Sequence, residues 1–192
     1  LIVTLISGIL IFFVQNGIII GLPTMAGSYE IFFVNSLGLP VGTGAVIFIV
    51  LFVTILLVSL ILTQRKSKVL LNTVLLCFTF ILIGYASYTL VLIRSNYDTP
   101  IDENNPENLL SFITYLRREQ YGDTPSLIYG QHFNAEYKVK NGRIVYKEGR
   151  PIYALKGDRY EIVDNKDTPD YAEEDKLLFP RAWNTQPKYK QP

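Results

Sequence analysis

Four residues of this sequence have side chains suited to chemistry on a substrate. Asp102 and Glu103 lie in an acidic run that follows the third long apolar stretch. Carboxylates at this position could hold a polar acceptor or act as a general base, which takes a proton from a reacting hydroxyl. The alternative is that they solvate and cap a helix predicted to begin at residue 106, because acidic side chains favour the positive end of a helix.

Arg94 and His132 are the other two candidates for substrate binding. Arg94 ends the third apolar stretch, and a guanidinium group suits a phosphate such as that of a lipid-linked sugar. Alternatively, the Arg94 side chain simply reaches from the membrane to water. His132 is the only histidine, and a loop histidine is a candidate acid, base or substrate ligand. A structural role is the alternative, because the sequence identifies no partner for it.

Several other kinds of site are excluded or disfavoured. One histidine and the lone Cys77 cannot form a zinc site, and a lone cysteine cannot form an internal disulfide. We expect no cofactor and no nucleic-acid partner, because the sequence has neither a glycine-rich phosphate loop nor a strongly basic surface. Tyrosines recur at predicted hairpin positions, where sheet packing is more typical than sugar stacking; they are Tyr137, Tyr146, Tyr153 and Tyr160.

The elements that would position these residues begin with a membrane region at 1–94. This half contains only five charged residues, and three uncharged stretches at about 1–22, 43–63 and 69–93 are long enough to cross a bilayer core of about 30 Å as helices. Single strands cannot cross, since their backbone groups would stay unpaired in lipid. We therefore predict a multi-pass protein of the cell membrane, in contact with the lipid bilayer.

The orientation of these helices follows from the short segment 64–68. It carries three basic residues and no acidic residue, which predicts a cytoplasmic position. Residues 95–192 then lie outside the cytoplasm, in the periplasm if the membrane is a bacterial inner membrane. Between the first two spans, residues 27–39 predict a short interfacial or re-entrant helix, with Pro23, Gly38 and Pro40 as breaks.

Residues 95–192 predict a small extracytoplasmic α+β region made of one helix and a β meander. The helix is expected at about 106–120, with Asn105 as its cap and Gly122 after its end. Hairpins are expected around Asn141-Gly142 and around 156–158, with a short strand before them at 126–129. Because the sequence opens inside an apolar run without an initiator methionine, we expect an internal fragment of a larger protein.

Several runs of the sequence resemble the bacterial branch of the transmembrane-protein-260-like family of protein O-mannosyltransferase relatives. They include Phe32–Pro40, Ile83–Tyr88, Ile93–Ser95, Pro100–Asn108, Tyr115–Asp123, Tyr129–Ala135 and Leu178–Arg181. The resemblance covers most of the chain, and the residues DENNPEN and REQYGD carry its most specific part.

The resemblance implies a membrane glycosyltransferase of the GT-C type. Such an enzyme moves a sugar from a polyprenyl-phosphate donor to a hydroxyl of an acceptor protein or glycan outside the cytoplasm. The resemblance also implies that the general base lies in an outer loop near the N-terminus of the full protein. No catalytic residue is therefore assigned in this chain. The alternative is a non-catalytic, membrane-anchored binding module that works in envelope assembly or secretion.

Overall fold

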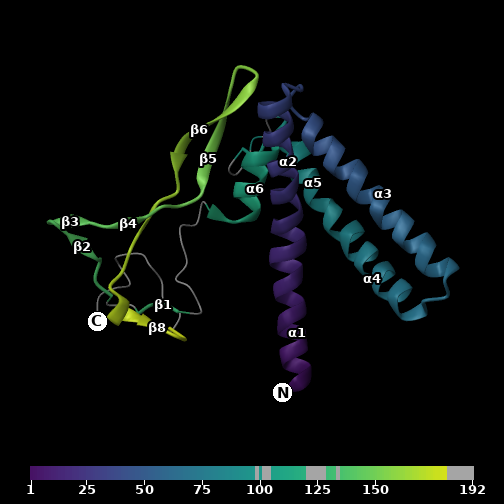
Figure 1. The fold of residues 1–192 in the computed structure, drawn as a ribbon, viewed down its shortest axis with the longest axis horizontal. Coiled ribbons are helices and arrows are strands. Elements are labelled where there is room, and N and C mark those ends of the chain that lie inside the picture. Colours follow the sequence, from purple (N-terminus) through teal and green to yellow (C-terminus); the bar gives the residue numbers. More distant parts are fainter. Residues whose placement is uncertain (98–99, 101–104, 120–128, 133–134, 181–192) are drawn as a thin grey trace. The chain divides into compact units, whose positions relative to one another are not determined.

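The structure, a computed structural model, describes residues 1–97, 100, 105–119, 129–132 and 135–180 (Figure 1). The chain divides into two compact units. The first contains Leu1–Gln120 together with Leu155–Tyr160, and the second contains Tyr121–Ala154 together with Glu161–Pro192. The first unit thus extends beyond the predicted membrane region at 1–94, and the following paragraphs describe each unit by itself.

The first unit begins with one unbroken helix. The α-helix α1 (Ile2–Phe12) continues through a π-helical stretch, η1 (Phe13–Gly21), into α2 (Leu22–Leu37) (Figure 1). The whole helix has 36 residues. At 1.5 Å per residue it is about 54 Å long, well above the roughly 30 Å of a bilayer core.

This continuity corrects the prediction of a separate interfacial or re-entrant helix at 27–39. Pro23 does not break the chain, because it lies in the first turn of α2, directly after the π-helical stretch. A local π adjustment is one way in which a helix accommodates a proline that lacks an N–H. The helix ends at Gly38, whose φ of 66° is left-handed, and the N–H groups of Gly38 and Leu39 donate to the carbonyls of Val34 and Phe33.

Two further helices complete the predicted set of three. The second is α3 (Thr43–Arg65), and the third runs without interruption from α4 (Val69–Tyr85) through the 3-10 turn η2 (Ala86–Tyr88) to α5 (Thr89–Ser95). All three are long and apolar enough to cross a membrane, which confirms the expected number among the described residues. α2 and α3 bury Val34 and Phe48, and the Phe48 ring lies 5.1 Å from the Tyr29 ring.

The amphipathic helix α6 (Leu109–Leu116) is shorter than the predicted helix at 106–120. Its cap is Asn108, which exchanges hydrogen bonds with Ser111, and not Asn105 as predicted. Asn105 instead accepts a hydrogen bond from the Ser95 hydroxyl at 3.1 Å. α6 packs against α2 at Gly27, where an added Cβ would lie 2.8 Å from Cδ1 of Ile113. This packing explains why α6 belongs to the helical unit.

The β-rich part contains the two predicted local hairpins. β2 (Val139–Lys140) pairs with β3 (Arg143–Ile144), and the turn residues Asn141 and Gly142 have φ values of 52° and 74°. β5 (Pro151–Lys156) pairs with β6 (Arg159–Asn165) through a turn in which Gly157 has a φ of 62°. Both turns need left-handed backbone, which Asn and Gly adopt readily.

The other strands correct the prediction of a meander, in which each strand pairs with the next. β1 (Gly130–Gln131) pairs with β8 (Lys176–Leu177), and β4 (Tyr146–Lys147) pairs with β7 (Thr168–Pro169). The 3-10 helix η4 (Glu173–Asp175) lies directly before β8. Of the strand predicted at 126–129, only Tyr129 lies within the described residues. Strands of two residues carry too little pattern to reveal a distant partner.

Candidate functional site

Arg94 is exposed in the last turn of α5 and forms no ion pair with any residue that the structure describes. The residues after it are tied back toward α6. Ser95 is buried and donates to Asn105, and Asn96 Nδ2 donates to the carbonyl of Glu107 at 3.0 Å. The end of the third long helix is therefore held in place while the Arg94 side chain faces outward.

The other predicted substrate ligands lie either outside the described residues or in the other compact unit. Asp102 and Glu103 lie outside the described residues. His132 belongs to the second compact unit, whereas Arg94 belongs to the first. A site composed of all four residues therefore remains a prediction.

His132 has an acidic partner that the sequence did not reveal. Its Nε2 atom lies 2.9 Å from Oδ1 of Asp175, and because an ionised carboxylate only accepts, Nε2 is the donor. The backbone N–H of Glu136 donates to the other oxygen of Asp175 at 3.0 Å. That bond, together with the bond from His132, lowers the pKa of Asp175 despite some desolvation. The contacts link the segment after β1 to η4, which fits the structural alternative for His132.

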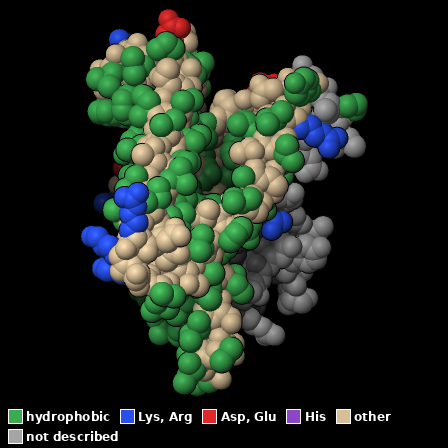
Figure 2. Space-filling view, turned by 90° about the vertical axis from the view of Figure 1, so that its right-hand side faces the viewer, with side chains coloured by type: hydrophobic (Ala, Val, Ile, Leu, Met, Phe, Trp, Pro, Cys, Tyr) green, Lys and Arg blue, Asp and Glu red, His purple; other side chains and the backbone are tan. Residues whose placement is uncertain are grey.

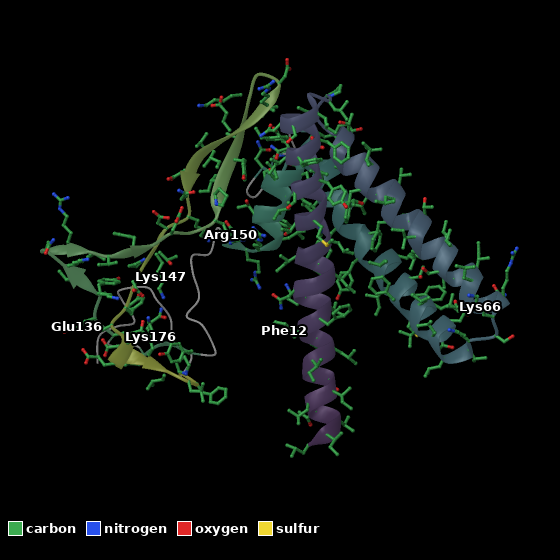
Figure 3. The ribbon with its side chains drawn as sticks, in the orientation of Figure 1. Phe12, Lys66, Glu136, Lys147, Arg150 and Lys176 are labelled. Carbon is green, nitrogen blue, oxygen red and sulfur yellow. The ribbon has the colours of Figure 1, made fainter. Side chains whose placement is uncertain are left out.

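A second carboxylate of this unit, Asp170, is surrounded by three lysines. Figure 3 labels two of them, Lys147 and Lys176. Its oxygens lie 3.1 Å from Nζ of Lys147, 3.4 Å from Nζ of Lys176 and 3.6 Å from Nζ of Lys138. Burial alone would raise the pKa of Asp170, but the bonds from Lys147, Lys176 and the Tyr171 N–H lower it to about 2. Because these lysines come from separate segments, Asp170 joins the strands of a unit that has few long strands.

The least expected site is Glu30 in the apolar half. Glu30 lies in α2 and is only 1 % exposed. Its two carboxylate oxygens accept from the backbone N–H of Gly42 at 2.5 Å and from that of Ala45 at 2.9 Å. Glu30 thus caps the first turn of α3 from a different helix, where a negative charge is stabilised by the helix dipole and the free N–H groups.

Gly44 makes this capping possible. A Cβ at Gly44 would lie 2.5 Å from Cα of Glu30 and 2.7 Å from the carbonyl oxygen of Tyr29. Both are backbone atoms, so a side chain at this position would force the two helices apart. The glycine therefore lets the start of α3 approach α2 closely enough for Glu30 to reach its N–H groups.

The start of β6 is held at the same place. The Asn35 side chain donates to the carbonyl of Tyr160 at 2.8 Å and accepts from the Tyr160 N–H at 2.9 Å. The Tyr160 hydroxyl donates to Glu30 at 3.3 Å. Burial, together with the charge and the hydrogen bond of Glu30, raises the pKa of Tyr160 to about 12. Glu30, Asn35 and Tyr160 are called the buried clamp below.

Sequence reasoning missed the buried clamp, although one signal was available. Glu30 is the only acidic residue in 1–94, and a lone charge among apolar residues requires a partner when it is buried. Nothing in the sequence indicated that Asn35 and Tyr160, which are 125 positions apart, would meet.

Of the four tyrosines predicted for sheet packing, Tyr160 contacts α2 through its hydrogen bonds, and the ring of Tyr137 lies 5.2 Å from the ring of Tyr171. No described group of three or more His, Cys, Asp or Glu side chains is placed to hold a metal ion. The described contacts of the site are therefore hydrogen bonds, ion pairs and aromatic packing.

Part of the chain matches a known protein family. Residues 122–192, less than half of the chain, are similar to a family of unknown function (DUF8416). Neither the curated proteins nor the solved structures contain a match. The similarity covers the β-rich part and not the three long helices.

Proposed function

We propose that this chain is part of a GT-C-like membrane glycosyltransferase, which transfers a sugar from a polyprenyl-phosphate donor to a hydroxyl of an extracytoplasmic protein or glycan. The observation that carries the proposal is the exposed Arg94 at the end of the third membrane-length helix. An arginine here is available to bind an anionic phosphate at the edge of the bilayer. The resemblance described above gives the reaction class.

In this reaction the oxygen of the acceptor hydroxyl forms a bond with the anomeric carbon of the sugar. The bond between that carbon and the phosphate oxygen breaks, and the lipid phosphate leaves with the bonding electrons. A carboxylate base takes the proton of the hydroxyl. Arg94 binds the phosphate as its negative charge grows, and Asp102, Glu103 and His132 are the proposed contacts for the polar substrate groups.

The proposal includes an orientation in a bacterial inner membrane. The basic segment 64–68 lies in the cytoplasm, and residues 95–192 lie outside it, because basic loops are retained on the cytoplasmic side. This orientation puts Arg94 on the side where lipid-linked sugars are used as donors. The separate interfacial helix once expected at 27–39 is no longer part of the proposal.

The test is sugar transfer from a polyprenyl-phosphate donor by membranes that contain the protein. Arg94→Gln is expected to lower transfer about tenfold or more, since a charge-assisted hydrogen bond contributes about 1.5–3 kcal/mol. Arg65→Gln, at the other end of the helical region, removes the same charge and serves as the control. Unchanged glycosylation in a strain that lacks the protein would argue against the enzyme.

A second candidate is the non-catalytic binding module anchored in the membrane. It is favoured by the way in which charged side chains of the β-rich unit pair with each other, as Asp170 does with Lys147 and His132 does with Asp175. Such pairing fits a structural role for these side chains better than a catalytic one. A stable partner that co-purifies with the protein, together with unchanged glycans in the deletion strain, would favour this module over the transferase.

A further inference from the structure

A groove lies between the end of α3 and the start of α4, far along the chain from the residues assigned to sugar transfer. Its volume is about 360 Å³, and residues of both helices and of the turn between them line it. Figure 3 labels Lys66 at this end of the two helices. The proposed function makes no use of this groove.

The mouth of the groove is positively charged. Lys66 and Lys68 line it, and both are exposed. Within the part of the chain that the structure describes, no acidic side chain forms an ion pair with either lysine or with the adjacent Arg65. Figure 2 looks onto this end of the helices and shows basic side chains close together beside a hydrophobic surface. The mouth can therefore accept an anion without first breaking an ion pair.

The body of the groove is apolar. Leu62 lines it on α3, and Leu71 and Leu75 line it on α4. Leu75 lies six residues beyond the start of α4, so the groove extends about 9 Å from the basic turn toward the apolar middle of the helices. A ligand that fits both regions carries an anionic group joined to a hydrocarbon chain.

The wall of the groove is held by hydrogen bonds between the two helices. Asn72 Nδ2 donates to the hydroxyl of Thr63 at 3.0 Å and to the carbonyl of Leu60 at 3.1 Å. Thr63, which lines the groove beside Ser59, is buried and donates in turn to the carbonyl of Ser59 at 2.8 Å. These bonds fix the spacing of α3 and α4 before any ligand binds.

We propose that this groove binds one anionic phospholipid. The phosphate of its head group lies between Lys66 and Lys68, and the first part of an acyl chain lies along Leu62, Leu71 and Leu75. The charge of the mouth selects an anionic lipid over a zwitterionic one, and the apolar body selects a lipid over free phosphate. Basic pockets between membrane helices bind anionic head groups on the same principle. The inference does not depend on the proposed transferase activity.

The test measures lipid retained by the detergent-purified full chain, using native mass spectrometry with added phosphatidylglycerol or phosphatidylcholine. We expect one tightly held phosphatidylglycerol, with affinity reduced about fivefold by Lys66→Gln or Lys68→Gln, the equivalent of about 1 kcal/mol per basic residue. Arg65→Gln removes a charge from the same turn but not from the groove, so its affinity is expected to stay close to that of the unchanged chain. Equal retention of the two lipids, or an equal loss in Arg65→Gln, would overturn the proposal.

A second comparison tests the apolar body. Leu71→Trp fills the groove and is expected to abolish the single bound lipid, whereas Leu70→Trp changes a residue that does not line the groove and is expected to keep it. Excess inorganic phosphate is expected to leave the bound lipid in place. Displacement of the lipid by phosphate alone, or unchanged retention in Leu71→Trp, would contradict a lipid site.

Discussion

Glu30 carries a charge in a region with almost no others, and it is buried at 1 % exposure. The cost of taking a carboxylate out of water is offset by bonds that end on the backbone N–H groups of Gly42 and Ala45. Glu30→Ala would leave these donors without an acceptor. We expect it to lower the free energy of unfolding by about 2 kcal/mol, as measured by thermal unfolding in detergent.

The control for Glu30 is Tyr160→Phe, which removes only the longest of the three bonds to the carboxylate, at 3.3 Å. This variant is expected to lower the free energy of unfolding by about 1 kcal/mol, which is less than the effect of Glu30→Ala. If the two variants unfolded at the same temperature as the unchanged chain, the carboxylate would not be holding α3.

Gly44 provides a steric test of the same contact. Gly44→Ala would place a Cβ 2.5 Å from the backbone of Glu30, so we expect α2 and α3 to separate at a cost of about 1–3 kcal/mol. Gly84→Ala is a matched control on α4, because no described atom beyond its own stretch of helix lies within 4 Å of its Cβ position. It is expected to be neutral or slightly stabilising, since alanine favours a helix more than glycine does. Thermal unfolding of both variants decides the comparison.

The lowered pKa of Asp170 predicts how the stability of the folded chain changes in acid. Its pKa is lowered from 3.8 to about 2 in the folded state, so the unfolded chain binds its proton first as the pH falls. The stabilisation is complete above about pH 4 and is lost as the pH falls toward 2. Asp170→Asn should remove this part of the acid dependence while also lowering stability at neutral pH, because three lysines lose their common partner.

The measurement for Asp170 is the midpoint of thermal unfolding across this pH range. Asp158→Asn, which changes an exposed acid in the β5–β6 turn, is the control. An Asp170→Asn chain that lost stability in acid as steeply as the unchanged chain would refute the role of the lysine cluster.

At the scale of elements, the side chain of Asn35 in α2 pairs with the backbone of β6. The Asn35 amide both donates to and accepts from the backbone of Tyr160, as a neighbouring strand would. Asn35→Ala is expected to speed hydrogen exchange of the Tyr160 amide about tenfold, which corresponds to the loss of about 1.4 kcal/mol. Asn16→Ala removes an amide that donates only within its own helix, to the Phe12 carbonyl, and should leave that exchange rate unchanged.

The elements that the sequence predicted are those with local causes. The three apolar helices follow from runs of uncharged residues, and the two hairpins follow from turns that require left-handed backbone at Asn141, Gly142 and Gly157. The errors lie where a residue's own type does not decide the structure. Pro23 favours a break, but the π-helical turns before it accommodate it within one helix. The partners of β1 and β4 lie far along the chain.

The candidate site was predictable only where a residue acts alone. Arg94 is exposed at a helix end, as its sequence position implied. The partner of His132 was not foreseen, since Asp175 is 43 positions away. The buried clamp and the phospholipid groove depend on which helices approach each other. Gly44 allows the close approach of α2 and α3, and the hydrogen bonds of Asn72 hold α3 against α4.

For the whole molecule, the decisive property is the side of the membrane on which each unit lies. The proposed orientation places the turn at Ser67 in the cytoplasm and the β5–β6 turn outside it, because three basic residues in 64–68 resist translocation. A Cys77→Ser chain can carry a single new thiol as Ser67→Cys or as Asp158→Cys, both at exposed positions. A membrane-impermeant maleimide should label Asp158→Cys in intact spheroplasts, and Ser67→Cys only after the membrane is permeabilised.

The reverse labelling pattern would put Arg94 and the β-rich unit in the cytoplasm, away from lipid-linked sugars that face outward, and the transferase proposal would then lose its substrate. The phospholipid groove would survive such a result, because its lysines and leucines bind an anionic lipid from either leaflet. Labelling and lipid retention therefore separate the two proposals. The sidedness experiment bears on sugar transfer and not on the groove, whereas the Lys66, Lys68 and Leu71 variants bear on the groove and not on sugar transfer.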